Sequence, residues 1–395
     1  MSLPTITADG RGSAIPEAEF DELLAQVTAW VEGPGEMWAE RIEREESVPD
    51  ALWHELDDAG FLALAAPRDL GGRGLSFVQW MGLMEVFSRS HASVRMIVHV
   101  LNGTWRAMNP YADDLQREQF VRPAVAGKLR VAFTLTEPGN GTGADITSSV
   151  RREGDTYLLT GRKHLITFGV HCDYWLLFAR LEGSTGKDGT VALLVDRATP
   201  GVVVEDSSQT MGVHGTDHAT LTFTDAPVPV AHRLGAEGDG LRVALGGFLT
   251  PSRISVAMSC VGLAQRAQQL AVEYATQRVT FGRPLASRQA IAFLLAENEA
   301  DIEAAKALTL TAAQAWQDDH DRAPALSSMA KLTAVDMLTR VTDKALQVHG
   351  GIGYWKTMPI ERVYRDARAQ RFEEGTNEIQ KTVIARDLFE RAARP

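Results

Sequence analysis

The sequence predicts an α+β protein of several domains, arranged in the order helices, strands, helices. Helical periodicity fills residues 16–128, and short β-rich runs separated by Gly, Asp, Ser and Pro follow at 130–235. After Gly240 long stretches with helical spacing return. We therefore expect an N-terminal α-helical domain at 1–128, a middle antiparallel β domain at 129–236 and a C-terminal helical bundle domain at 237–395.

The N-terminal region contains four segments with apolar residues at helical spacing. They lie at residues 15–31, 47–60, 76–90 and 94–108. The middle region contains six runs rich in β-branched and aromatic residues, at 130–135, 156–168, 174–181, 190–196, 201–206 and 219–225. These patterns predict helices and then a sheet.

The C-terminal region predicts long helices packed side by side. One apolar stripe at helical spacing is formed by Ile291, Leu295, Ile302, Ala305, Ala312 and Trp316. A comparable run covers residues 329–348. Small residues on these faces favour a bundle.

Composition excludes several classes of function. The formal net charge of −11 argues against a nucleic-acid partner, which needs a basic face. No run approaches the roughly 18 apolar residues of a membrane span. Two cysteines and the absence of a signal-peptide pattern predict a cytoplasmic protein. His349 has no Cys or His partner at metal spacing, so we expect no metal site.

Three glycine-containing motifs are candidate ligand loops. "FTLTEPGNGTGAD" at 133–145 follows a strand, "RVTFGRPLASRQ" at 278–289 separates two helices, and "LQVHGGIGY" at 346–354 ends a helix. Exposed amides, hydroxyls and an arginine can bind phosphate oxygens or the edge of a heterocycle. Each motif by itself is equally compatible with an ordinary turn.

"EGTNEIQ" at 374–380 follows Glu373, so two adjacent carboxylates precede a helix start. Asn377 and Gln380 have the spacing of a capping box. A carboxylate here is either a catalytic base or part of a well-capped helix.

The joint order of "LTEPG", "LITFG", "DAPVP", "RVTFGRPL", "VHGGIGY" and "EGTNEIQ" resembles the signature series of the acyl-CoA dehydrogenase family. The resemblance runs from Phe20 to the end of the chain. It implies a C-terminal domain of four helices, bound FAD, an acyl thioester substrate and a homotetramer.

The resemblance also implies roles for individual residues. The flavin would be lined by Phe133, Leu135, Thr136, Thr142, Leu165, Ile166 and Thr167. The FAD of a neighbouring subunit would be reached by Arg278, Thr280, Phe281, Gln289, Gln347, Gly350 and Gly351, and that nucleotide site would be completed by Thr376 and Glu378. The substrate would be contacted by Thr142, Trp105, Arg106, Thr250, Ser252, Arg253, Glu373 and Gly375.

By the register of the same motif, Glu374 would be the catalytic base. It would remove the α-proton of an acyl-CoA or acyl-carrier-protein thioester while the β-hydrogen leaves as hydride to the flavin, giving a trans-2-enoyl thioester. An electron-transfer-flavoprotein-like acceptor would take the electrons. An acyl-CoA oxidase, a flavin monooxygenase and a non-catalytic assembly subunit are the alternatives.

Glu373 departs from the family pattern, which has an aromatic or apolar residue before the base. One interpretation is that Glu373 points to solvent or pairs with an arginine such as Arg368 or Arg371. The other is that the acyl pocket is polar, with Trp105 and Arg106 on the helix that floors it.

Overall fold

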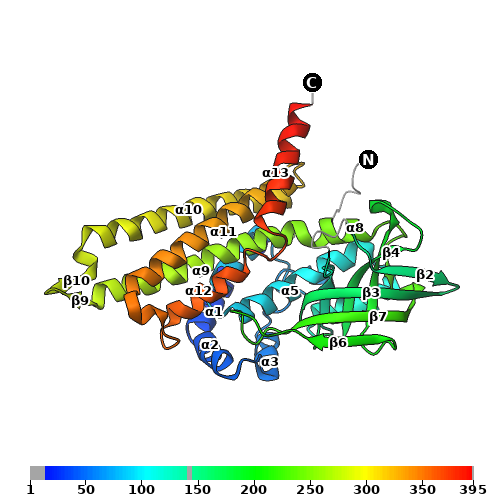
Figure 1. Ribbon diagram of the computed structural model, residues 1–395, viewed down its shortest axis with the longest axis horizontal. Helices are drawn as coiled ribbons and strands as arrows, with labels where there is room; N and C mark the ends of the chain where they lie inside the picture. Colours follow the sequence, from blue (N-terminus) through cyan, green and yellow to red (C-terminus); the bar gives the residue numbers. More distant parts are fainter. Residues whose placement is uncertain (1–13, 140–144, 394–395) are drawn as a thin grey trace.

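The computed structural model describes residues 14–139 and 145–393 and shows three packed regions in the predicted order (Figure 1). The helices of the first region are α1 (Glu17–Glu32), α2 (Pro34–Glu45), α3 (Asp50–Asp58), α4 (Phe77–Phe87), α5 (Ala92–Met108), α6 (Asp114–Gln116) and α7 (Arg122–Val125). The sequence did not predict α2. Its Gly-Pro start resembles a chain break, but proline is tolerated in the first helical turn.

The middle region is one eight-stranded sheet. Its strands are β1 (Val131–Thr134), β2 (Ser149–Glu153), β3 (Thr156–Thr167), β4 (Tyr174–Leu181), β5 (Thr190–Asp196), β6 (Val202–Asp206), β7 (His218–Pro229) and β8 (Arg233–Leu234). The order is β6-β7-β3-β2-β4-β5-β8, with β1 beside β4. The expectation of an antiparallel domain holds for most pairs, but β1 and β2 each run parallel to β4 because the chain crosses over before β4.

The third region returns to helices. A short α8 (Gly240–Arg242) continues as a π-helical segment (Val243–Leu249) into the long helix of the bundle. The bundle consists of α9 (Thr250–Gln277), α10 (Gln289–Gln317), α11 (Ala323–His349), α12 (Pro359–Ala369) and α13 (Asn377–Ala392), with the hairpin β9 (Val279–Thr280) and β10 (Arg283–Pro284) between α9 and α10. α13 stands off the body of the molecule (Figure 1).

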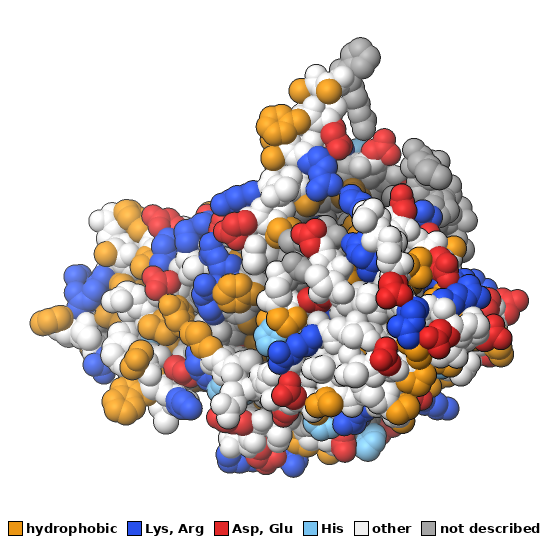
Figure 2. Space-filling view, turned by 45° about the vertical axis from the view of Figure 1, so that its right-hand side comes forward, with side chains coloured by type: hydrophobic (Ala, Val, Ile, Leu, Met, Phe, Trp, Pro, Cys, Tyr) orange, Lys and Arg blue, Asp and Glu red, His pale blue; other side chains and the backbone are white. Residues whose placement is uncertain are grey.

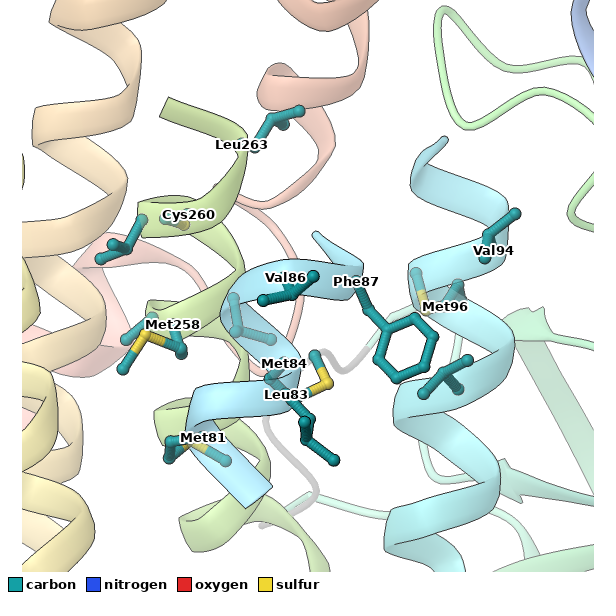
Figure 3. Close-up of a cluster of buried hydrophobic side chains, with 14 of the residues drawn as sticks. Met81, Leu83, Met84, Val86, Phe87, Val94, Met96, Met258, Cys260 and Leu263 are labelled. Atoms are coloured by element: carbon teal, nitrogen blue, oxygen red, sulfur yellow. The ribbon is translucent and has the colours of Figure 1, made fainter. Parts of the chain in front are cut away.

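Helix α5 runs through the centre of the molecule, between the bundle and the sheet (Figure 1). Every residue of α5 except Gly103 is buried, including the polar side chains of Arg95, His99 and Arg106. Helix α4 packs against both α5 and α9, and Figure 3 shows Phe87 pointing from α4 toward α5. This apolar contact fixes α5 relative to α9, so polar groups on α5 have defined positions.

None of the helices in residues 14–139 and 145–393 is long and apolar enough to cross a membrane.

Candidate active site

The link between α12 and α13 is held in an unusual backbone conformation. Glu374 has φ +53° and Gly375 has φ +94°, a region that residues other than glycine rarely adopt. Side chains fix this conformation through the two carbonyls. Arg253 Nε and Gln380 Nε2 donate to the carbonyl of Glu374 at 3.2 and 3.1 Å, and Lys331 Nζ and Gln380 Nε2 donate to that of Gly375. The link is therefore positioned by α9, α11 and α13 together.

The capping-box prediction for Asn377 and Gln380 is wrong. α13 begins at Asn377 with Thr376 as its N-cap residue, and the Asn377 amide donates to Asp336 on α11 at 2.9 Å. Gln380 uses its amide for the carbonyls of the preceding link instead of returning to the helix start. Gln380 therefore forms the hydrogen bonds that hold the link and does not form the capping hydrogen bond at the start of α13.

The carboxylate of Glu374 accepts a hydrogen bond at its Oε1 from Ser252 Oγ on α9, at 2.8 Å. Ser252 Oγ lies 2.9 Å from Nε2 of His99 on α5. Burial raises the pKa of Glu374 to about 7, and the charge of Glu373 adds to the rise while the Ser252 hydrogen bond opposes it. A carboxylate with this pKa is a better proton acceptor than an exposed glutamate and is still ionised in part at neutral pH.

Glu373 points inward and pairs with Arg95 on α5. Both of its oxygens accept from the guanidinium at 2.8 Å, and Arg95 is only 1% exposed. Burial alone would raise the pKa of Glu373, but Arg95 holds it below its ordinary value. Arg371 instead contacts Asp336 at 3.3 Å. Glu373 therefore pairs with an arginine, as one interpretation expected, but the partner is Arg95 and neither Arg368 nor Arg371, because the link turns Glu373 toward α5 and away from solvent.

A small cavity lies between α5 and α9, beside the Ser252 hydroxyl that holds Glu374. Its volume is about 10 Å³, and its lining includes Trp80, His99, Gly103, Arg106, Phe248 and Ser252. Arg106 is thus at the cavity, where burial lowers its pKa to about 9. Trp105 is not among the lining residues, because its side chain packs into the core between α5 and the sheet.

The remaining predicted substrate residue on α9, Thr250, begins that helix. Its hydroxyl donates to the carbonyl of Leu245 at 3.1 Å, in the π-helical segment. It is half-buried, whereas Ser252 and Arg253 are buried. Only the latter two contact the link that carries Glu374.

The predicted flavin-ring residues surround the end of β3. Leu165 is 56% exposed although it is a large apolar side chain, and it has φ +56°. The side chain of Ile166 lies in the sheet core, so only its backbone is available to a ligand, and Thr136 and Thr167 are half-buried. An exposed leucine in strained backbone, beside threonine side chains, fits an aromatic ring that needs an apolar cover and polar edges.

Two other members of this set face the protein interior. Phe133 stacks on Phe248 of the cavity with ring centroids 4.2 Å apart, and Leu135 is 7% exposed, with its carbonyl accepting from Lys163 Nζ at 3.1 Å. Phe133 therefore connects β1 to the cavity wall. Thr142 lies outside the described residues.

The predicted nucleotide residues form two groups on one chain. Arg278, Phe281, Gln289, Gln347, Gly350 and Gly351 are exposed, at the β9–β10 hairpin and the end of α11. The stacking of Tyr274 on His349, with centroids 4.6 Å apart, holds these two segments together. Thr280 belongs to this group and accepts from Arg288 at 3.0 Å.

Thr376 and Glu378 form the second group, near Lys331. At about 1.5 Å per helical residue, Lys331 and His349 lie about 27 Å apart along α11. A single chain does not bring the two groups together.

Four residues of the site were not predicted from the sequence: Arg95, His99, Lys331 and Gln380. A signal did exist for two of them. Arg95 and His99 are four residues apart in a segment that otherwise reads as a buried helix, and charged or polar side chains in such a place need partners. The sequence does not identify those partners, which lie more than a hundred residues away.

Comparisons with known families agree with this fold. Three profiles match successive parts of the chain, described as acyl-CoA dehydrogenase N-terminal domain (residues 17–128), middle domain (132–226) and C-terminal domain (238–389). The chain belongs to the acyl-CoA dehydrogenase family, whose members are flavoprotein oxidoreductases. The resemblance and the fold class predicted from the sequence are confirmed.

Individual relatives cover nearly the whole chain. An acyl-CoA dehydrogenase of Bacillus subtilis is 36% identical, over 89% of this chain and 93% of the relative. The caffeyl-CoA reductase-Etf complex subunit CarC of Acetobacterium woodii is 34% identical, over 89% and 93%. The structure of butyryl-CoA dehydrogenase from Megasphaera elsdenii aligns with a TM-score of 0.90 at 30% identity, over 95% and 99%.

Proposed function

We propose that this protein catalyses the FAD-dependent α,β-dehydrogenation of an acyl thioester, with Glu374 as the base that removes the α-proton. The observation that carries this proposal is the position of Glu374. Its carboxylate is bound to Ser252 beside a cavity, and its pKa is raised to about 7. A base of this pKa suits the removal of a weakly acidic proton near neutral pH.

The residues of the chain have distinct tasks in this reaction. Ser252 orients the Glu374 carboxylate, and Arg253, Gln380 and Lys331 hold the link behind it. When Glu374 takes the α-proton it becomes neutral, which removes a partly buried charge. When bound, FAD would supply the acceptor for the hydride that leaves the β-carbon. The product would be the trans-2-enoyl thioester.

The same proposal includes an assembly. The separation of the two nucleotide groups along α11 supports a cofactor site completed by a neighbouring subunit. Phe281 is 97% exposed, and Phe389 on the projecting helix α13 is 75% exposed. Figure 2 shows hydrophobic side chains on the surface, including the part that projects at the top of the view. Exposed aromatic side chains of this kind mark surfaces that another chain covers. The exposed groups support an assembly of at least two chains, and a homotetramer is what the family resemblance implies.

The electron acceptor is part of the proposal as well. The relationship to a subunit of a reductase-Etf complex supports an electron-transfer-flavoprotein-like acceptor. An oxidase would instead return the electrons to oxygen, so aerobic hydrogen peroxide formation without added acceptor would identify that alternative.

The test is anaerobic reduction of the purified FAD-loaded protein by butyryl-, octanoyl- and palmitoyl-CoA and short branched and hydroxylated acyl-CoAs, with bleaching of the flavin as the signal. Glu374→Gln should retain FAD but reduce the bleaching rate about 100-fold or more, because the proton has no acceptor. Glu303→Gln, which removes the same charge from an exposed position on α10, is the matched control. Bleaching of Glu374→Gln at the wild-type rate would refute the base assignment.

A further inference from the structure

The cavity lined by Ser252, which binds Glu374, has a second polar group in its lining that makes no hydrogen bond to Glu374. This group is the imidazole of His99, which is 3% exposed and forms part of the cavity lining. The donor and acceptor roles around it follow from the two hydrogen bonds that connect Glu374 to Ser252 and Ser252 to His99.

The direction of the hydrogen bonds begins at the carboxylate. Ionised Glu374 can only accept, so Ser252 Oγ donates its proton across the 2.8 Å contact. A hydroxyl has one proton, so Oγ must accept in its other contact, at 2.9 Å to His99 Nε2. The proton of the imidazole therefore lies on Nε2.

The other ring nitrogen is then a bare acceptor. Burial, with Arg95 and Arg106 nearby, lowers the pKa of His99 to about 3, so the ring is neutral at physiological pH and Nδ1 carries a lone pair. Nδ1 is buried and has no hydrogen-bond partner among residues 14–139 and 145–393. A buried acceptor of this kind needs a donor from a ligand or a water.

The rest of the cavity limits what that donor can be. Arg106 in the same lining carries a positive charge, which disfavours an ammonium group and favours an oxygen-centred donor. Trp80 and Phe248 contribute apolar side chains to the lining. A volume of about 10 Å³ accommodates about one water-sized group.

We propose that the substrate is a short acyl thioester with a hydroxyl on its acyl chain, and that His99 Nδ1 accepts the hydrogen bond from this hydroxyl. This inference rests on the proposed function, because it places the acyl chain beside Glu374. His99 is then the residue that selects a hydroxylated acyl group over a plain alkyl group.

The experiment uses pairs of substrates that differ only by hydroxyl against methyl: 4-hydroxybutyryl-CoA with pentanoyl-CoA, and 5-hydroxypentanoyl-CoA with hexanoyl-CoA. We measure kcat/KM for flavin reduction, and Kd from the flavin spectrum in Glu374→Gln, which binds without reacting. Wild-type protein should prefer the hydroxylated member of at least one pair by about tenfold, the worth of one buried neutral hydrogen bond.

Variants distinguish recognition of the substrate hydroxyl by His99 from a general effect of the substitution on the fold. His99→Phe should abolish the preference, and His99→Gln, whose amide can donate to Ser252 and still offer an oxygen acceptor, should retain part of it. Thr104→Val, which removes a buried hydroxyl on the same helix whose partner is the Val100 carbonyl, should leave the preference unchanged. If His99→Phe does not fold, the inference is tested by the preference for the hydroxylated substrate in wild-type protein and its reduction in His99→Gln.

Two outcomes would overturn the inference. One is efficient reduction by pentanoyl- or hexanoyl-CoA with no preference for either hydroxylated partner, which leaves the proposed dehydrogenation intact. The other is an equal preference in wild-type and His99→Phe protein. Failure of every thioester to reduce the flavin would count against the proposed function instead, and the Kd ratio in Glu374→Gln would then still decide whether the cavity selects a hydroxyl.

Discussion

Arg95 on α5 and Glu373 before α13 form a two-pronged ion pair, with both N–O distances at 2.8 Å. The pair joins the helix that lines the cavity to the link that carries Glu374. It also places a second negative charge directly beside the proposed base, where it raises the pKa of Glu374. This buried contact therefore adds to the Ser252 hydrogen bonds in holding the cavity wall and the base to each other.

Breaking this pair should destabilise the fold. Glu373→Leu leaves Arg95, which is 1% exposed, as a buried charge without its carboxylate, and we expect a loss of about 3–5 kcal/mol in the free energy of unfolding. Urea unfolding of the FAD-loaded protein, followed by circular dichroism, measures the change. Replacement of both partners, Arg95→Met with Glu373→Leu, should recover part of the loss because no unpaired charge remains.

The matched control is Glu153→Leu, which breaks the exposed pair of Glu153 with Arg151 at 3.0 Å. Exposed pairs contribute at most about 1 kcal/mol, so this variant should unfold close to the wild-type midpoint. Equal effects of Glu373→Leu and Glu153→Leu would show that the Arg95 pair is not a structural link.

The rate of flavin reduction by substrate should depend on pH through Glu374. Because its pKa is about 7 and the ionised form is the base, the rate should rise with pH and reach half of its maximum near pH 7. Ser252→Ala removes a hydrogen bond to the ionised form and should move the midpoint upward. Glu373→Gln removes a neighbouring negative charge and should move it downward.

Stopped-flow reduction between pH 5.5 and 9 gives these midpoints. Folding raises the pKa of Glu374 from 4.5, so the same group also lowers the stability of the fold as the pH rises from 4.5 to about 7. A rate that does not change with pH across this range, as expected for an exposed glutamate with a pKa of 4.5, would contradict the burial of the base.

The third prediction concerns the shared cofactor site. Arg278→Ala, Gln289→Ala and Phe281→Asp should each lower FAD content and weaken the oligomer together. These exposed residues belong to the group at the His349 end of α11, and that end is about 27 Å along the helix from Lys331, beside which the Thr376 group of the same chain lies. One charge-assisted contact is worth about 1.5–3 kcal/mol, or about tenfold or more in FAD affinity.

Light scattering after gel filtration measures the mass of the oligomer. The ratio of flavin to protein absorbance measures the FAD content. Leu115→Asp, at a 71% exposed apolar residue on α6, is the control that should change neither. Monomeric wild-type protein with full FAD content would exclude a site shared between subunits.

The local pattern of the sequence predicted much of the architecture. The order of the three regions, the long helices α10 and α11 and most strands of the sheet were all predicted, because helical and strand periodicities depend on neighbouring residues. α2 was missed since its Gly-Pro start resembles a break, and the parallel pairing of β1 and β2 with β4 was missed since pairing depends on the path of the chain. The family motif also placed Glu374 in register as the proposed base.

Only the tertiary structure decided what surrounds Glu374. The sequence suggested Arg368 or Arg371 as partners of Glu373 because they are near in the chain, but the fold supplies Arg95 from 278 positions away. The fold likewise places Ser252 between His99 and Glu374. Gln380, which the sequence predicted as a capping residue of the helix, instead donates to the carbonyls of the link. Such contacts form because a buried charge or donor must find a partner, and which partner it finds depends on how α5, α9 and α11 pack.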